Sequence, residues 1–335
     1  MRPGIVAALA CCVGTLACGA SSTPASPSSS PQGAPPASAT GCARTSVGLT
    51  PLSDLTSGTY KGEPGGLYAD GSNVRPSAHE AEGRARARAI VPRDRNGAPA
   101  ENGRYALVSV GMSNTTQEFS AFKKLADADP ARDSHLSIVD GAQGGQTAAL
   151  WSQPGCACWG TLDARLASAG VSAGQVAAVW LKLADANPAG GWPGHAVTLR
   201  NETETVVRLL GERFPHLSAV YLSSRIYAGY ATSTLNPEPY AYESAFSIRW
   251  LITDQVRGVG GLGYSGTDGV PWLSWGPYLW ADGLIPRSDG LTWACSDLSS
   301  ADGTHPSSTG QTKVAQQLLT FLVTDSTARL WYLAR

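Results

Sequence analysis

From about residue 103 onward, short apolar runs alternate with longer stretches in which apolar residues recur at helical spacing. The runs are nearly continuous, which is typical of strands covered on both faces of a sheet. They predict strands at Tyr105–Val110, Leu136–Asp140, Val176–Lys182, Leu217–Leu222 and Val270–Leu279. The other stretches predict helices at Thr116–Ala126, Thr161–Ala169, Thr198–Phe214, Glu243–Arg257 and Gly310 to about Val323. This alternation favours an α/β fold, a three-layer sandwich around one parallel sheet of about five strands.

The first 18 residues have the layout of a bacterial signal peptide. Arg2 precedes an apolar stretch that is too short to span a bilayer. The stretch ends at Leu16-Ala17-Cys18, which is similar to the site where lipoproteins are cleaved and lipidated, although Thr15 stands where an aliphatic residue is usual. A plain secretory signal with a coincidental cysteine is the alternative.

Two further segments precede the alternating pattern. Residues 19–41 are almost entirely Ser, Pro, Ala, Gly and Thr, and they predict a disordered linker because they hold too few apolar groups to offset the entropy of ordering. Residues 42–102 contain one helical stretch, Ser77–Ala89, and we expect them to form an extension packed on the domain of residues 103–335. The expected protein is exported, either secreted or held at the cell envelope, and it contacts a membrane only through a lipid anchor at Cys18.

The amino-acid composition argues for a folded core and against a nucleic-acid partner. Hydrophobic residues make up 42% of the chain, which is enough for a sizeable core, and charged residues only 15%, with a formal net charge of −1. A nucleic-acid-binding surface needs a basic stripe, and the sequence contains none. We therefore expect no nucleic-acid partner.

The cysteines also point to export. Four of the seven lie outside the expected signal peptide: Cys42, Cys156, Cys158 and Cys295. Their even number fits disulfides in an oxidising compartment. Cys156 and Cys158 stand too close to pair comfortably, so we expect each to reach Cys42 or Cys295. Metal ligation is the alternative, but no His lies at ligand spacing from them, and we expect neither a metal nor an organic cofactor.

Ligands of open α/β sheets bind beyond the carboxyl ends of the strands. Ser113 follows the first predicted strand through Gly111, which permits a sharp turn. Thr115 and Glu118 have the spacing of a capping box, so Ser113 stands where a helix begins. A serine that only caps this helix is the alternative. After the second strand, consecutive glycines including Gly145 expose backbone N–H groups that suit an oxyanion hole or a simple tight turn.

The strongest chemical signal lies near the C-terminus, in Asp302-Gly303-Thr304-His305-Pro306. An Asp three residues before a His can fix the tautomer of the imidazole and stabilise the imidazolium that forms when the His accepts a serine proton. A loop histidine beside a capping aspartate is the alternative.

Together these three segments resemble the SGNH (GDSL-type) hydrolase superfamily over roughly residues 104–322. Ser113 falls in a segment that is similar to the nucleophile block, with Met112 where Asp is usual, and Gly145 matches the glycine of the oxyanion hole. Asp302 and His305 match the terminal Asp-x-x-His block, and the order along the chain is that of the family. The resemblance implies a flavodoxin-like fold and a catalytic triad of Ser113, His305 and Asp302.

This sequence departs from the family pattern at one block. The family's third block is a Gly-x-Asn-Asp whose Asn donates to the oxyanion, but here the strand Val176–Lys182 runs into a loop without that glycine. Asn187 is the only amide in this loop, and it is expected to join Ser113 and Gly145 in the oxyanion hole. An Asn in a turn before Pro188 is the alternative, and the oxyanion would then depend on backbone donors and Lys182.

The resemblance implies a serine esterase that hydrolyses a carboxylic ester of a small molecule or of an O-acetylated carbohydrate. A lipid-ester or thioester hydrolase is the alternative within the enzymes, and a catalytically weak surface binding lipoprotein of the same fold is the alternative outside them. Polar and aromatic residues that follow the fourth strand could line a substrate pocket or could serve packing: Arg225, Tyr227, Glu238 and Tyr240.

Overall fold

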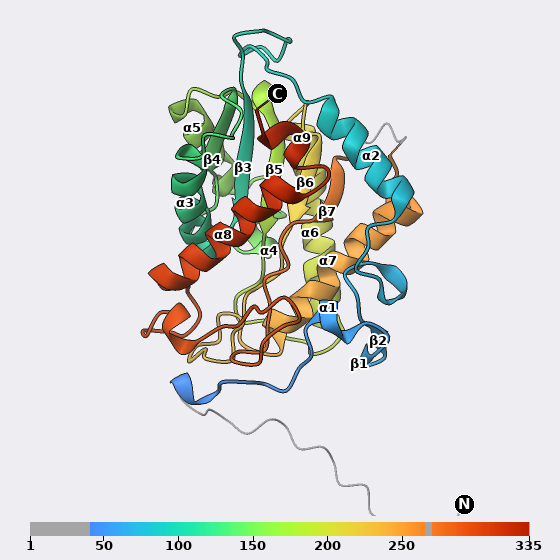
Figure 1. Cartoon of the computed structure of the whole chain (residues 1–335), viewed down its shortest axis with the longest axis vertical. Helices are drawn as coiled ribbons and strands as arrows, with labels where there is room; N and C mark the ends of the chain where they lie inside the picture. The colour runs from blue at the N-terminus through green and yellow to red at the C-terminus, as the bar shows by residue number, and fades with distance from the viewer. Residues whose placement is uncertain (1–40, 265–269, 335) are drawn as a thin grey trace, which may run out of the picture. The chain divides into compact units, whose positions relative to one another are not determined.

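The computed structural model describes residues 41–264 and 270–334 (Figure 1). The expected signal peptide, Cys18 and nearly all of the expected linker lie outside the described residues. Within the described ranges, no helix is long and apolar enough to span a membrane.

Five parallel strands form the central sheet, in the order β4-β3-β5-β6-β7. Their bounds are β3 Tyr105–Gly111, β4 Leu136–Asp140, β5 Val176–Lys182, β6 Ala219–Leu222 and β7 Trp272–Trp275. The expected α/β three-layer sandwich with a five-stranded parallel sheet is therefore confirmed. The last strand is shorter than the predicted Val270–Leu279, since Pro271 and Pro277 flank it and have no N–H to donate to a ladder.

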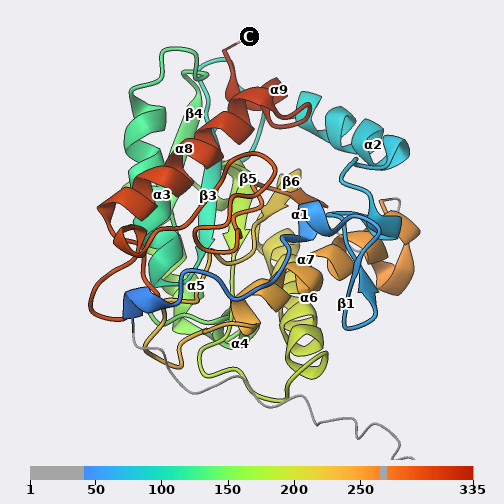
Figure 2. The same cartoon turned by 60° about the horizontal axis from the view of Figure 1, so that its bottom comes forward.

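The helices cover both faces of the sheet (Figures 1 and 2). The step from β3 to β4 runs across the sheet in the opposite direction to the later steps, so right-handed crossovers place α3 on one face and α5, α6 and α7 on the other. The long helix α8 packs along α3. The bounds are α2 Ser77–Arg88, α3 Ser113–Asp127, α5 Ala157–Ser168, α6 Gly194–Arg213, α7 Tyr240–Arg257 and α8 Ser308–Thr324, with short helices α1 Leu52–Leu55, α4 Ala148–Trp151 and α9 Arg329–Tyr332.

Helix α3 begins earlier than its capping-box spacing predicted. The helix starts at Ser113, with Met112 in an extended conformation before it, and no side chain caps it. Thr115 Oγ1 instead donates a 2.8 Å hydrogen bond to the carbonyl of Lys182, and the Glu118 carboxylate accepts from the Lys182 ammonium. The prediction of a capping box was wrong, because the side chains of Thr115 and Glu118 both bond to Lys182 at the end of β5.

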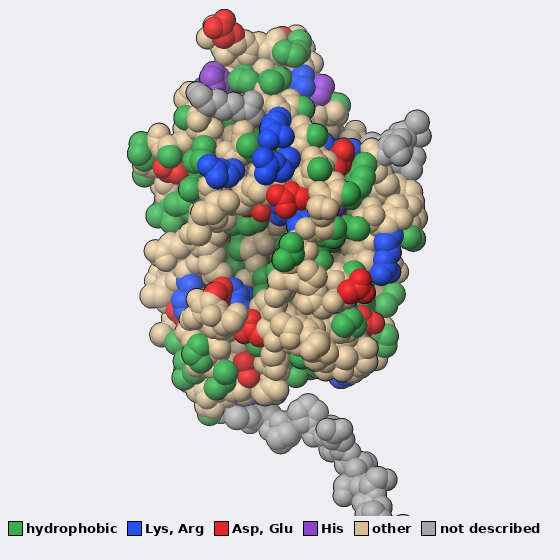
Figure 3. All heavy atoms as spheres, turned by 45° about the vertical axis from the view of Figure 1, so that its right-hand side comes forward, with side chains coloured by type: hydrophobic (Ala, Val, Ile, Leu, Met, Phe, Trp, Pro, Cys, Tyr) green, Lys and Arg blue, Asp and Glu red, His purple; other side chains and the backbone are tan. Residues whose placement is uncertain are grey.

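Residues 41–102 include the helix that covers the β7 edge of the sheet. A small antiparallel hairpin, β1 Thr59–Tyr60 and β2 Glu63–Pro64, precedes α2. His79 on α2 lies 2.8 Å from the carbonyl of Leu273 in β7 through its Nε2, and Trp272 Nε1 donates to the carbonyl of His79. Helix α2 thereby covers the edge strand, which would otherwise expose unpaired backbone groups. On the face of the molecule in Figure 3, basic and acidic side chains lie interspersed.

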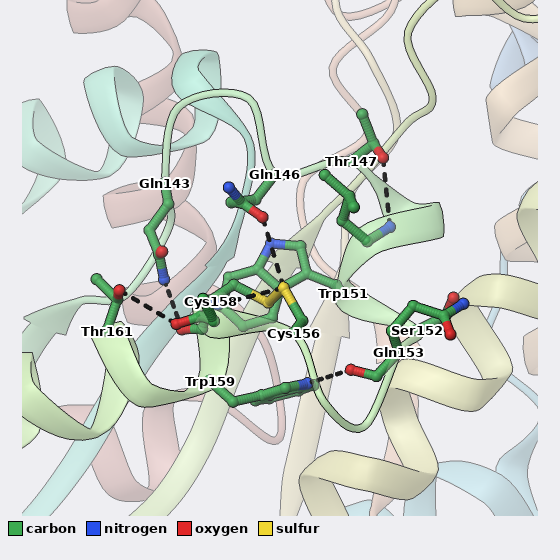
Figure 4. Close-up of a disulfide and its surroundings, with 12 residues drawn as sticks. Gln143, Gln146, Thr147, Trp151, Ser152, Gln153, Cys156, Cys158, Trp159 and Thr161 are labelled. Carbon is green, nitrogen blue, oxygen red and sulfur yellow. Dashed lines mark hydrogen bonds between the residues drawn. A yellow bond between two sulfur atoms is a disulfide. The ribbon is translucent and has the colours of Figure 1, made fainter.

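The disulfide pairing differs from the sequence-based expectation. Cys42 is bonded to Cys295, and Cys156 is bonded to Cys158 (Figure 4). Cys156 precedes α5 and Cys158 lies in its first turn, which sets their Cα atoms 5.1 Å apart, within the range that disulfides span. The prediction that each of these two reaches Cys42 or Cys295 was wrong, because the bend of the chain into α5 brings Cys156 and Cys158 within bonding distance.

Candidate active site

Ser113 lies where β3 ends and α3 begins, at the carboxyl end of the sheet. Gly111 makes this turn possible, since a Cβ at this position would lie 2.4 Å from both the carbonyl oxygen of Lys182 and Thr115 Oγ1. Only glycine allows β3 and β5 to approach so closely. Ser113 is the first residue of α3, so its backbone N–H has no acceptor within the helix and faces the positive end of the helix dipole.

The structure brings His305 and Asp302 to this serine. His305 Nε2 lies 2.7 Å from Ser113 Oγ, and His305 Nδ1 lies 2.6 Å from Asp302 Oδ2. The side chains of His305 and Asp302 are 25% and 24% exposed, so the pair can be reached from solvent. Three residues that are up to 192 positions apart in the sequence therefore form one continuous hydrogen-bonded chain.

The Asp302 carboxylate is held in place by the turn that carries it. Its Oδ1 accepts hydrogen bonds from the backbone N–H groups of Thr304 and His305, at 2.8 Å and 3.0 Å. Burial alone would raise the pKa of Asp302, but these bonds and the imidazole lower it. Gly303 has a φ of +60°, and a Cβ there would lie 2.0 Å from the Tyr230 carbonyl. This glycine lets the turn pack tightly against the segment that follows β6.

The glycine loop after β4 lies beside Ser113. A Cβ at Gly144 would lie 3.9 Å from Ser113 Cβ, and Gly145, with a φ of +74°, has open space around it. The loop is fastened by the N–H of Gln143, which donates to the carbonyl of Gly111. Ser113 and Gly145 line the same cavity, so the structure brings together two of the three groups expected in the oxyanion hole.

Asn187 is not brought to this cavity. Its side-chain oxygen accepts a hydrogen bond from Thr234 Oγ1, and its N–H donates to the Thr234 carbonyl at 2.9 Å. Its φ is +52°, a conformation that Asn tolerates in turns, and it lines a neighbouring hollow of about 160 Å³. The expected third donor is therefore corrected: Asn187 fastens its own loop to the segment of Thr234.

Lys182 does not replace it. Its ammonium donates 2.7 Å hydrogen bonds to both carboxylate oxygens of Glu118, and both side chains are fully buried. Burial lowers the pKa of Lys182 to about 8, against the opposing effect of Glu118. This ion pair lies behind Ser113, since Lys182 pairs in register with Gly111 and Glu118 lies on α3.

The cavity in front of Ser113 has a volume of about 230 Å³ and includes polar groups that sequence reasoning missed. Asn114 Nδ2 and Asn236 Oδ1 are buried without a hydrogen-bond partner in the described part of the chain. No motif marks Asn236, which follows Leu235 in an irregular loop. The cavity is lined by Met112, Ser113, Asn114, Gly145, Thr147, Ala186, Arg225, Leu235, Asn236, Thr304 and His305.

Of the four polar and aromatic residues expected to line a pocket after β6, two do line a cavity and two are buried in the core. Arg225 lines the cavity beside Ser113, whereas Tyr240 lines the hollow that holds Asn187. Glu238 is buried and accepts hydrogen bonds from Trp280 Nε1 and two backbone N–H groups. Tyr227 is fully buried and donates to the carbonyl of Arg44. The last two residues therefore serve packing.

A second, wider hollow of about 880 Å³ opens on the other side of His305. Ser296, Ser299, Ser300 and Ser307 line it, together with Gln117, whose Oε1 is buried without a partner among the described residues. His305 thus lines both the small cavity and the wider hollow, whereas Asp302 lines only the wider one. Within residues 41–264 and 270–334, no group of three His, Cys, Asp or Glu residues is placed to hold a metal ion.

Fold and site together define a three-layer α/β protein with a Ser–His–Asp hydrogen-bonded chain at the carboxyl end of its parallel sheet. No protein-family model matches the chain, and no curated protein does.

Several solved structures are similar in fold. A protein from Bacteroides fragilis, described as an acylhydrolase, is 14% identical with a TM-score of 0.39, over 76% of this chain and 100% of that one. The periplasmic domain of a lipopolysaccharide acetyltransferase from Salmonella ser. Paratyphi A is 11% identical with a TM-score of 0.38, over 75% and 90%. A gut microbial diltiazem-metabolizing enzyme is 15% identical with a TM-score of 0.37, over 65% of this chain and 46% of that one. Identities and TM-scores this low give no information about the chemistry of this chain.

Proposed function

We propose that this chain is an exported serine esterase of the SGNH type, in which Ser113 attacks a carboxylic ester, His305 is the general base and Asp302 orients it. One observation carries the proposal: the hydrogen bonds of 2.7 Å and 2.6 Å that join Ser113 Oγ, the His305 ring and the Asp302 carboxylate. Both distances lie in the range that proton transfer requires.

In the first step, His305 Nε2 takes the proton of Ser113 Oγ as this oxygen bonds to the carbonyl carbon. The carbonyl oxygen gains the negative charge and is held by the backbone N–H groups of Ser113 and Gly145. Asp302 stabilises the imidazolium, which keeps its Nδ1 proton. The tetrahedral intermediate then collapses, the bond to the alcohol oxygen breaks, and His305 returns the proton to the leaving alcohol.

In the second step, water replaces the alcohol. His305 takes a proton from the water as its oxygen attacks the acyl-enzyme carbonyl, and the same N–H groups hold the second oxyanion. Collapse breaks the bond to Ser113 Oγ, which recovers its proton from His305, and the carboxylic acid leaves.

The two hollows favour a short acyl group and a polar alcohol. The cavity at Ser113 and Gly145 holds about 230 Å³, which suits an acetyl-sized acyl group better than a long lipid chain. The second hollow that His305 lines is wide and has four serines in its lining, as suits the sugar of an O-acetylated carbohydrate. The bonds Cys42–Cys295 and Cys156–Cys158 fit an oxidising compartment outside the cytoplasm.

Labelling with a fluorophosphonate tests the proposal directly, since this reagent phosphonylates an activated serine. We expect the full chain to be labelled once per molecule and to hydrolyse p-nitrophenyl acetate, and we expect Ser113→Ala to lose both properties. A folded wild-type chain that is not labelled, or a label that persists in Ser113→Ala, would sink the proposal.

A further inference from the structure

Arg225 brings a positive charge to the cavity of Ser113. It follows β6, which is separated from β3 by β5, so its side chain reaches over the end of β5 across roughly two strand spacings of 4.8 Å. It is only 3% exposed, and it lines the same cavity as Ser113, Gly145 and His305. The guanidinium is therefore accessible from the cavity and almost nowhere else.

No group in the described part of the chain pairs with this guanidinium. None of its five N–H donors makes a hydrogen bond or an ion pair there, and its Nε is completely buried. The other buried arginines, and the half-buried Arg75, behave differently. Arg249 pairs with Glu63 at 2.5 Å, Arg287 with Asp289 at 2.6 Å, and Arg75 with Asp325 at 2.7 Å.

The three carboxylates that interact electrostatically with Arg225 already accept hydrogen bonds from other groups. Glu118 accepts from Lys182, Asp302 from His305, and Glu238 from Trp280. Burial lowers the pKa of Arg225, while these three carboxylates oppose that effect from a distance. Because a guanidinium keeps its proton inside proteins, the cavity holds a buried cation with no bonded counter-ion among the described residues, which is costly unless a ligand supplies one.

We propose that Arg225 is the binding residue for a carboxylate that the substrate carries close to its scissile ester. The inference rests on the proposed esterase function and names its substrate class: a short ester with a free carboxylate. The planar fork of a guanidinium matches both oxygens of a carboxylate. The cavity of about 230 Å³ has room for an acyl or alcohol group of a few carbon atoms that bears this charge.

The other unpaired groups in the cavity fit such a ligand. Asn114 and Asn236 both line the cavity, and each carries a buried polar atom, Nδ2 and Oδ1, without a partner among the described residues. Each of these groups pays a desolvation cost in the empty cavity that a polar ligand would remove. A purely apolar acyl group would leave all three uncompensated.

Two matched pairs of esters test the proposal, and they distinguish the side of the ester on which the charge lies. Monoethyl succinate and its neutral analogue ethyl levulinate differ on the acyl side. 4-Acetoxybenzoate and 4-acetoxybenzamide differ on the alcohol side. We expect the wild-type chain to prefer the carboxylate member of one pair, when acid release is followed by titration at constant pH.

Arg225→Met should lower kcat/KM for that carboxylate ester by about 10- to 100-fold, the size of a lost charged hydrogen bond, and change the neutral ester by less than about threefold. Arg225→Lys should retain part of the preference. Leu235→Met is the matched control, because it reshapes the same cavity without changing its charge and should affect both members of a pair alike. Fluorophosphonate labelling and thermal unfolding verify that each variant is folded.

Equal hydrolysis of both members by the wild-type chain would overturn the proposal. So would an equal loss of both in a folded Arg225→Met chain, which would make Arg225 a donor to the oxyanion. A binding measurement tests the role of Arg225 independently of the proposed esterase activity. Calorimetry on Ser113→Ala should detect the carboxylate ester but not its neutral analogue, and Arg225→Met in the same background should abolish binding. This result does not require turnover, so it decides the role of Arg225 even if the chain hydrolyses no ester.

Discussion

The ammonium group of Lys182 donates to both carboxylate oxygens of Glu118 at 2.7 Å, and neither side chain is exposed to solvent. This ion pair joins the end of β5 to the second turn of α3, directly behind Ser113. A charge pair so completely desolvated contributes modest net stability, but either partner alone is a buried uncompensated charge. The pair therefore ties the turn that carries Ser113 to the end of β5.

Removing one partner of this pair should damage the fold more than removing both. We expect Lys182→Met to lower the free energy of unfolding by about 3–5 kcal/mol, because it leaves the Glu118 carboxylate buried alone. The double variant Lys182→Met/Glu118→Met should recover to within about 2 kcal/mol of the wild type and should still be labelled by a fluorophosphonate. Urea unfolding measures the first effect. Loss of labelling in a stable double variant would show that Lys182 serves the oxyanion after all.

The orientation of His305 is the next testable point. Asp302→Asn keeps an oxygen for the N–H groups of Thr304 and His305, but its amide favours the wrong imidazole tautomer. We expect kcat for p-nitrophenyl acetate to fall by about four orders of magnitude, with His305→Ala at least as severe. Thermal unfolding should change little in either variant, since both side chains are partly exposed. Unchanged turnover in His305→Ala would refute its role as the base.

The fold could be predicted from the sequence because its main signal is local. The continuous apolar runs at Leu136–Asp140 and Val176–Lys182 match β4 and β5 residue for residue. Errors arose where a contact from a distant segment decides the outcome. Thr115 and Glu118 have the spacing of a capping box, yet both side chains form hydrogen bonds with Lys182 in β5.

The candidate site could be predicted only where a local sequence pattern marks its residues. Asp302 and His305 fall in one turn, and Ser113 follows a strand end. Arg225 was recognised only as a pocket candidate, and Asn236 was not recognised at all, because their positions depend on loops without a periodic pattern. For the same reason Asn187 was misplaced: its contact with Thr234 joins two such loops.

Asn187 can be removed without touching the proposed oxyanion donors. Glycine tolerates the φ of +52° found there, so Asn187→Gly deletes the amide without adding backbone strain. We expect kcat/KM for p-nitrophenyl acetate to stay within about twofold. Thr234→Ala, which removes the hydrogen-bond partner of Asn187, should behave alike. A loss of about 100-fold or more in Asn187→Gly alone, the usual effect of deleting an oxyanion donor, would place this amide at the reacting carbonyl.

The two disulfides should differ in their effect on stability. Cys42–Cys295 joins residues 253 positions apart and so restricts the unfolded chain strongly, whereas Cys156–Cys158 closes a loop of only 2 positions. Chain entropy gives an upper value of about 5.5 kcal/mol for the first and about 1 kcal/mol for the second. Replacing each pair by serines and measuring urea unfolding tests this order. If the second double variant proved less stable than the first, loop entropy would not be the cause.

His79 should make the fold sensitive to mild acid. Burial lowers its pKa to about 4 from an ordinary value of 6.5, and the hydrogen bond to the Leu273 carbonyl only partly opposes this effect. Above pH 6.5 the imidazole is neutral in both the folded and the unfolded chain, so its contribution to stability does not change with pH there. Between pH 6.5 and 4 only the unfolded chain binds the proton, so the free energy of unfolding should fall by about 1.4 kcal/mol per pH unit, or about 3 kcal/mol in all.

The variant His79→Gln isolates this contribution, because Gln can still donate to the Leu273 carbonyl but does not titrate. Urea unfolding at several pH values should give a difference between wild type and variant that is flat above pH 6.5, narrows or reverses in favour of the variant as the pH falls toward 4, and is flat again below it. The acid loss should begin at α2, whose contacts with Trp272 and Leu273 cover the edge of the sheet. Parallel curves for the two proteins across this range would mean that His79 is protonated as readily in the folded chain as in the unfolded one.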